Sequence, residues 1–179
     1  LKMIKNLERH FVLDVESDGP CPGLYNMISF GICSVKDPTE GIYILLQPDI
    51  QNAGIPEARA VSGISYEEQV EDGISIESAM SLAASIITQY AQSERVTFWS
   101  DNPAFDWQFW NYYCHKYIGH NPAGFSARRI GDFDAGRRKN FLNTNAWKKW
   151  RKTGHTHNPL EDAMGNAEAL NHIIELIRC

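Results

Sequence analysis

Three strand-type segments follow one another near the start of the chain, before any segment with helical periodicity. Residues 10–16 alternate apolar and polar side chains, and residues 27–35 and 41–46 are mostly apolar and rich in β-branched side chains. Helix-type and strand-type segments then alternate, with helices over 75–91, 103–118, 144–152 and 159–177 and strands over 95–100 and 128–132. We therefore expect an α/β fold in which helices flank a mixed five-stranded sheet, in a single domain over residues 1–179.

Composition limits the kind of protein that this chain can form. Its 179 residues are 43% hydrophobic, which is enough to build a core. No run approaches the roughly 18 uninterrupted apolar residues of a membrane span, and residues 1–8 carry no apolar leader, so we expect a cytoplasmic protein without membrane contact. The four cysteines include no close pair, which favours reduced, mostly buried thiols over a zinc–thiolate site or disulfides.

Basic residues are concentrated in one part of an acidic chain. The formal net charge is −5, yet residues 128–152 hold nine of the 17 Lys and Arg residues against two acidic ones, Asp132 and Asp134. A basic region on an acidic body predicts contact with a polyanion such as nucleic acid. A solvated helix surface is the alternative.

Two carboxylates interrupt the first apolar strand. Asp14 and Glu16 are two residues apart, so their side chains share one face of the strand and repel each other. A divalent cation would neutralise both, and oxygen ligands suit Mg²⁺ or Mn²⁺. An edge strand with two solvated acids is the alternative.

Two further polar groups occur where helices begin. Asn102, Phe105 and Asp106 follow the strand over 95–100, and His157 and Asp162 flank the start of the last helix. Asn158 is expected to cap that helix, with Pro159 in its first turn and Glu161 at the spacing of a capping box. Taken alone, Asp106 and Asp162 could be favourable first-turn acids and His157 a residue of the cap.

Together, the Asp-x-Glu, Asn-x-x-Phe-Asp and His-x-x-x-x-Asp motifs, in this order, resemble the DEDDh 3′–5′ exonuclease superfamily over about residues 10–176. The resemblance implies a ribonuclease H-like fold and metal-dependent release of nucleoside 5′-monophosphates. It makes Asp14, Glu16, Asp106 and Asp162 the ligands of two Mg²⁺ or Mn²⁺ ions and His157 the general base. His155 is a competitor for the base, but its spacing to Asp162 does not match the family. Removing Asp14 or Asp162 should abolish hydrolysis and relieve charge repulsion.

The expected partner is single-stranded nucleic acid with a free 3′ end, and the small size favours RNA over DNA. The expected substrate contacts are Ser17, Leu24, Tyr25, Met27, Asn102, Phe105, Arg138, Lys139, Lys148 and Lys149. Two alternative functions are a ribonuclease-H-like endonuclease and a non-catalytic nucleic-acid-binding module. The resemblance also implies that the protein could form a homodimer, although no sequence feature of this chain indicates one.

Overall fold

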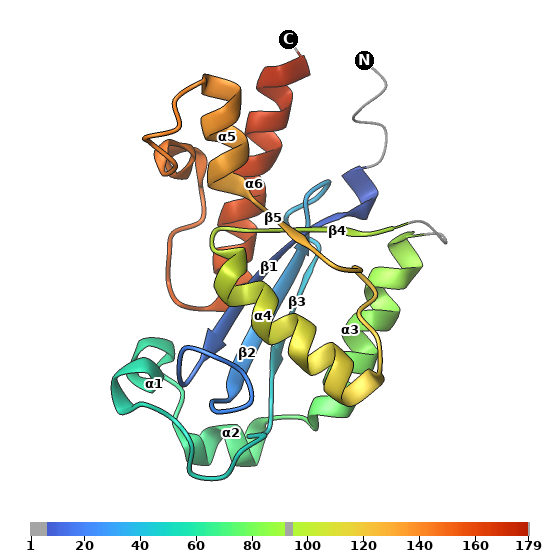
Figure 1. Cartoon of the computed structure of the whole chain (residues 1–179), viewed down its shortest axis with the longest axis vertical. Helices are drawn as coiled ribbons and strands as arrows, with labels where there is room; N and C mark the ends of the chain where they lie inside the picture. The colour runs from blue at the N-terminus through green and yellow to red at the C-terminus, as the bar shows by residue number, and fades with distance from the viewer. Residues whose placement is uncertain (1–6, 92–94, 179) are drawn as a thin grey trace.

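One mixed sheet organises the chain. A computed structural model describes residues 7–91 and 95–178, and its described strands lie in the order β3-β2-β1-β4-β5 (Figure 1). The expected five-stranded mixed sheet is confirmed, because β1, β2 and β3 pair antiparallel while β4 and β5 continue parallel to β1. The strands are β1 (His10–Ser17), β2 (Met27–Ser34), β3 (Gly41–Leu45), β4 (Thr97–Ser100) and β5 (Ala127–Arg129).

The alternation of β1 gives each face of the sheet its own core. Phe11, Leu13 and Val15 pack with α3 (Ile76–Ala91) and α4 (Pro103–Tyr113). Val12 faces the opposite side and packs with α6 (Pro159–Arg178) and with the start of α5 (Ile130–Arg138). Figure 1 shows the sheet between these two helical layers. Asp14 shares the face of Val12, which is the α6 side.

Gly31 decides how closely α6 approaches that face. It pairs with Asp14 across the β1–β2 ladder. A Cβ atom on Gly31 would lie 2.3 Å from the backbone nitrogen of Leu160 and from the carbonyl of Pro159. The first turn of α6 therefore rests directly on the strand beside Asp14, and only glycine leaves room for it.

Several helices differ from the sequence prediction. The helix expected over 103–118 ends as α-helix at Tyr113 and continues as a π-helical segment, η2 (Cys114–Ile118). The helix expected over 144–152 is a 3₁₀ helix, η3 (Ala146–Trp150), and the strand expected over 128–132 gives way to α5 after Arg129. The remaining helices are a 3₁₀ turn, η1 (Leu7–Arg9), and two short helices, α1 (Pro56–Ser62) and α2 (Tyr66–Asp72).

The described thiols agree with the expectation. Cys33 and Cys114 are buried and Cys21 is partly buried, and all three are free, whereas Cys179 lies outside the described residues. Residues 1–6, on which part of the leader prediction depends, also lie outside them. Among the described helices, none has the length and apolar content needed to cross a bilayer.

Candidate active site

Strand β1 carries the first two acids to the α6 side of the sheet. Asp14 pairs with Gly31 and Glu16 with Ser29, so both carboxylates leave the strand on the same face. The carboxylate of Glu16 is largely buried, with 12% of its side chain exposed. The predicted pairing of these two acids on one face is therefore present in the structure.

The third acid, Asp106, is fixed at the first turn of α4. One carboxylate oxygen accepts the backbone N–H of Val15 at 3.2 Å, and the other accepts the hydroxyl of Ser100. Asp106 is buried. Since Val15 lies between Asp14 and Glu16, the hydrogen bond ties the start of α4 to the strand that carries the other two acids.

The fourth acid, Asp162, lies in the first turn of α6. Asn158 caps this helix as predicted, because its side-chain oxygen accepts the backbone N–H groups of Leu160 at 3.0 Å and Glu161 at 3.3 Å. The predicted capping box is wrong, since the carboxylate of Glu161 accepts the hydroxyl of Thr156 instead. The start of α6 still directs the side chain of Asp162 toward β1.

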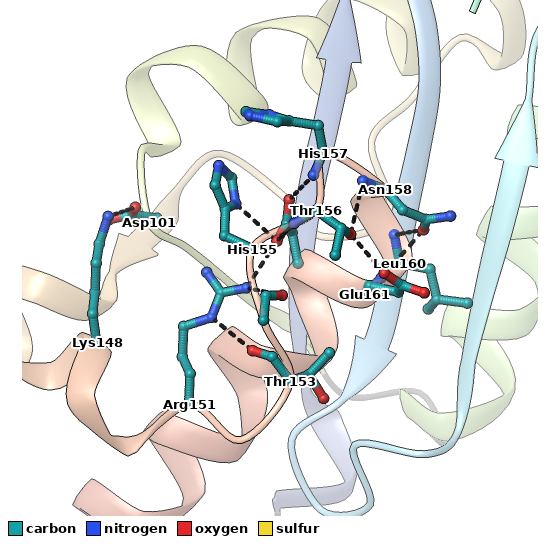
Figure 2. A network of polar contacts seen from close by, with 12 residues as sticks. Asp101, Lys148, Arg151, Thr153, His155, Thr156, His157, Asn158, Leu160 and Glu161 are labelled. Carbon is teal, nitrogen blue, oxygen red and sulfur yellow. Dashed lines mark hydrogen bonds and ion pairs between the residues drawn. The ribbon is translucent and has the colours of Figure 1, made fainter. Parts of the chain in front are cut away.

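Arg151, His155, Thr156 and His157, which Figure 2 labels, all contact the carboxylate of Asp162. Its Oδ1 accepts from Arg151 Nη2 at 2.8 Å and from the backbone N–H of Thr156 at 3.3 Å, and the ring Nδ1 of His155 lies 2.8 Å from the same oxygen. Its Oδ2 accepts the backbone N–H of His157 at 3.0 Å. One expectation is corrected by these contacts, since Asp162 stabilises this loop rather than only repelling other acids. His155 also contacts Asp162, and the choice of His157 over His155 as the base stays a prediction.

His157 stands at the rim of the acid cluster. Its backbone is left-handed, with φ of 61°, and the ring Nδ1 lies 3.7 Å from the Glu16 Oε1. The side chain is 44% exposed, so one side of the imidazole faces solvent while the other faces the carboxylates. A half-exposed imidazole can accept a proton from a solvent molecule.

The acids raise one another's pKa. Burial, followed by the charges of Asp106, Asp162 and Glu16, raises the pKa of Asp14 well above its ordinary value. Burial and the charges of Asp162 and Asp106 raise the pKa of Glu16 to about 7. Burial also raises the pKa of Asp106, against the hydrogen bonds from Ser100 and Val15. Each carboxylate would be more favourably charged beside a cation.

The donor set fits a divalent cation. Asp14, Glu16 and Asp162 each offer a carboxylate oxygen within 4.8 Å of the other two. Ligands that are all oxygen suit hard cations such as Mg²⁺ or Mn²⁺.

No protein-family model matches the sequence. The 3′–5′ DNA exonuclease Cap18 of Escherichia coli is 38% identical over 119 residues, which make up 66% of this chain and 63% of that protein. The chain thus spans slightly less than two thirds of this relative's length.

Solved structures give a match over nearly the whole chain. A full-length 3′-exonuclease superimposes with a TM-score of 0.70 at 13% identity, covering 93% of this chain and 81% of that one. The nuclease domain of 3′hExo, a DEDDh family member bound to rAMP, gives 0.69 at 12% identity, covering 93% and 91%. E. coli exonuclease I with single-stranded DNA and zinc gives 0.65 at 16% identity, covering 94% and 40%. The chain therefore shares the fold of these exonucleases.

The loop before α6 is held by residues that the motifs do not include. Glu168, on α6, accepts the backbone N–H groups of Lys152 at 2.7 Å and Thr153 at 2.8 Å, together with the Thr153 hydroxyl at 3.0 Å. Arg151 fits against Gly165, where a Cβ atom would lie 2.6 Å from its Nε. Sequence reasoning missed these residues and Ser100, because their role depends on contacts with Asp162, Asp106 and the loop that only the tertiary structure reveals.

Some of the expected substrate contacts are exposed in the structure, and others are buried. Leu24 is 70% exposed, while Tyr25 and Phe105 are partly exposed and Asn102 is exposed. Met27 is fully buried, so its expected contact with substrate is wrong. The Met27 side chain lies in the core at the start of β2. The Ser17 hydroxyl donates a hydrogen bond to the carbonyl of Gly19 at 2.7 Å.

Part of the basic region is neutralised within the chain. Arg138 pairs with the buried Asp134 at 2.6 Å, and Lys148 pairs with Asp101 at 2.6 Å. Both residues therefore have an acidic partner within the chain, and their expected contact with substrate stays a prediction. Lys139 is exposed at the end of α5, and Lys149 lies over the ring of Trp150 with its ammonium 4.7 Å from the centroid.

Proposed function

We propose that this chain is a divalent-cation-dependent 3′–5′ exonuclease that hydrolyses single-stranded nucleic acid to nucleoside 5′-monophosphates. The observation that carries the proposal is the cluster of Asp14, Glu16, Asp106 and Asp162 with the half-exposed His157 at its rim. The 38% identity to a protein named a 3′–5′ DNA exonuclease supports the same activity. All five residues come from one chain. Residues about 10–176 would form the catalytic domain.

The acids would hold the cations that such hydrolysis needs. Asp14, Glu16 and Asp162 would bind one Mg²⁺ or Mn²⁺, and Asp106 with Asp14 would support a second. When bound, such cations offset the charge of the phosphate and stabilise the attacking and leaving oxygens.

His157 would move the proton. Its ring would accept a proton from the attacking water, and the carboxylate of Glu16, 3.7 Å from Nδ1, would stabilise the resulting imidazolium. Asp162 contributes to this step by holding the backbone N–H of His157 at 3.0 Å, which fixes the turn that presents the ring. Each residue thus has one task that its position permits.

The substrate would enter as a single strand. Leu24, Tyr25 and Phe105 lie at least partly exposed and offer apolar and aromatic surface to unpaired bases. Stacking of this kind contributes about 1–3 kcal/mol per base and does not depend strongly on sequence. A duplex end would have to separate before its bases could stack in this way.

We propose DNA rather than RNA as the first substrate to test. The relative Cap18 is named a DNA exonuclease, and exonuclease I is seen with single-stranded DNA. The 3′hExo domain is bound to rAMP, so the fold also accepts a ribonucleotide. A contact to the 2′-hydroxyl would decide between the two sugars.

Digestion of matched DNA and RNA oligonucleotides tests this function. With a 5′ label and Mg²⁺, the wild-type chain should produce a ladder shortened from the 3′ end, with nucleoside 5′-monophosphates as the released product. D14N should release none. Internal fragments without mononucleotides would favour the endonuclease, and binding without hydrolysis in Mg²⁺ or Mn²⁺ would favour the non-catalytic module.

A further inference from the structure

His155 has no task in the proposed hydrolysis, yet it lies inside the site. Its Nδ1 is 2.8 Å from Asp162 Oδ1, and the centroid of its ring is 4.3 Å from that of His157. Figure 2 shows the two imidazoles beside each other on the loop that precedes α6. The left-handed backbone of His157 turns the loop so that both rings lie close to the carboxylate of Asp162.

These three residues form a donor set of their own. His155, His157 and Asp162 each offer one ligand atom, and the three atoms lie within 4.8 Å of one another. Two imidazole nitrogens and one carboxylate oxygen are ligands that zinc accepts and that Mg²⁺, which prefers oxygen, does not favour. By contrast, the set of Asp14, Glu16 and Asp162 is entirely oxygen.

The surroundings leave this second set open to a cation. The side chain of His155 is 59% exposed and that of His157 is 44% exposed, so an ion can enter from solvent and keep a water ligand. Arg151 lies on Oδ1 of Asp162, whereas Oδ2 accepts only the backbone N–H of His157 among the described donors. A carboxylate oxygen has two lone pairs, so Oδ2 retains one for an ion. The carboxylate of Glu16, 3.7 Å from His157 Nδ1, adds negative charge.

We propose that His155, His157 and Asp162 form a zinc site distinct from the all-oxygen cluster. The two sites share Asp162, and a zinc ion on His157 occupies the nitrogen that would accept the proton. Zinc therefore inhibits hydrolysis supported by Mg²⁺. The inhibition rests on the proposed function, whereas the zinc binding does not.

Direct zinc binding tests the proposal without nucleic acid. Zinc chloride is titrated into the metal-free full chain in competition with a chromophoric chelator, with excess Mg²⁺ present to fill the oxygen cluster. The wild-type chain should bind one zinc ion, and H155Q and H157Q should each weaken binding by more than about tenfold. H115Q is the matched control, since His115 is exposed on η2, and it should bind zinc like the wild type.

Two results would overturn the site. One is zinc binding by H155Q as tight as that of the wild type. The other is zinc binding that D14N abolishes while H155Q leaves it unchanged, because zinc would then occupy the oxygen cluster. In the activity assay, the zinc concentration that halves the rate should be higher for H155Q than for the wild type. The ratio should equal the factor by which H155Q weakens zinc binding. If the wild type binds zinc through His155 but hydrolyses nothing in Mg²⁺, the zinc site stands and the proposed function fails.

Discussion

At the scale of single residues, the same carboxylate chemistry has opposite effects at two positions. Burial, followed by the charges of Asp162 and Asp106, raises the pKa of Glu16 to about 7, whereas Asp162 accepts three hydrogen bonds, one of them from Arg151. Ionisation is therefore unfavourable at the first position, and the second carboxylate has partners for its charge.

E16Q should therefore stabilise the metal-free protein in a pH-dependent way. An acid whose pKa is higher in the folded state than in the unfolded state loses stability as pH rises from the unfolded pKa toward the folded one. The wild type pays this ionisation cost above about pH 4.5 and fully above pH 7. Unfolding in EDTA should show a gain of roughly 1–3 kcal/mol for E16Q at about pH 8, and almost none at about pH 4.5. An equal gain at both pH values would contradict the assigned cause.

D162A should have the opposite effect. Removing this carboxylate leaves the guanidinium of Arg151, 11% exposed, without its partner and releases the loop. Loss of one member of a buried pair costs about 3–5 kcal/mol, so D162A should unfold at lower urea concentration than the wild type in EDTA. A D162A variant as stable as E16Q would mean that the loop contacts contribute nothing.

The assignment of the proton to His157 can be tested against His155. H157A should lower turnover by about 10²–10⁴ and remove the acidic limb of the rate profile that protonation of the base produces. H155A should lower turnover less, because His155 is directed at Asp162 rather than Glu16. Rates are compared from about pH 5.5 to 9. A larger loss in H155A would transfer the role of base to His155.

At the scale of elements, Glu168 holds the first part of the loop between η3 and α6. The donors of Thr153 and Lys152 lower the pKa of Glu168, although burial opposes them. E168A should lose about 1–3 kcal/mol of stability and speed amide exchange at residues 152 and 153, since three hydrogen bonds to a charged acceptor disappear. E175A, exposed on the same helix, is the control. Unchanged exchange in E168A would show that the loop is held elsewhere.

The elements that the sequence predicts are those with a strong local pattern. Strand β1 alternates between two cores, and α6 carries both its cap and a regular apolar stripe, so both were predicted close to their observed bounds. Helix α5 was missed because its sequence contains two glycines and two aspartates. It is stabilised by contacts that no local pattern shows, such as Arg137 and Arg138 on Asp134.

The candidate site also has features that a local sequence pattern predicts and features that only the tertiary structure shows. Its acids stand out because carboxylates are unusual in apolar strands and at the start of buried helices. The position of His155 could not be predicted, since the distance to Asp162 depends on a left-handed turn at His157. The motifs thus indicate which residues react, and the tertiary structure shows what holds them.

At the scale of the whole molecule, we expect the basic region to contact the strand through residues without an acidic partner among the described residues, such as Lys139 and Lys149. Binding of a single strand weakens with salt, and its salt dependence is the slope of log K against log salt concentration. Neutralising Lys139 and Lys149 together should make this slope shallower by about 0.7 per residue. The control is K36Q, since Lys36 pairs with Glu8 at 2.7 Å. An unchanged slope in the double variant would mean that this surface does not contact the strand.

The acid cluster is proposed to remove nucleotides from a 3′ end. The most direct measurement compares linear single-stranded DNA with a covalently closed circle of the same sequence, in one reaction with Mg²⁺ and zinc excluded. The linear strand should be converted to nucleoside 5′-monophosphates while the circle stays intact, and D14N should leave both intact. Cleavage of the circle by the wild type, at a rate comparable to that of the linear strand, would contradict the claim.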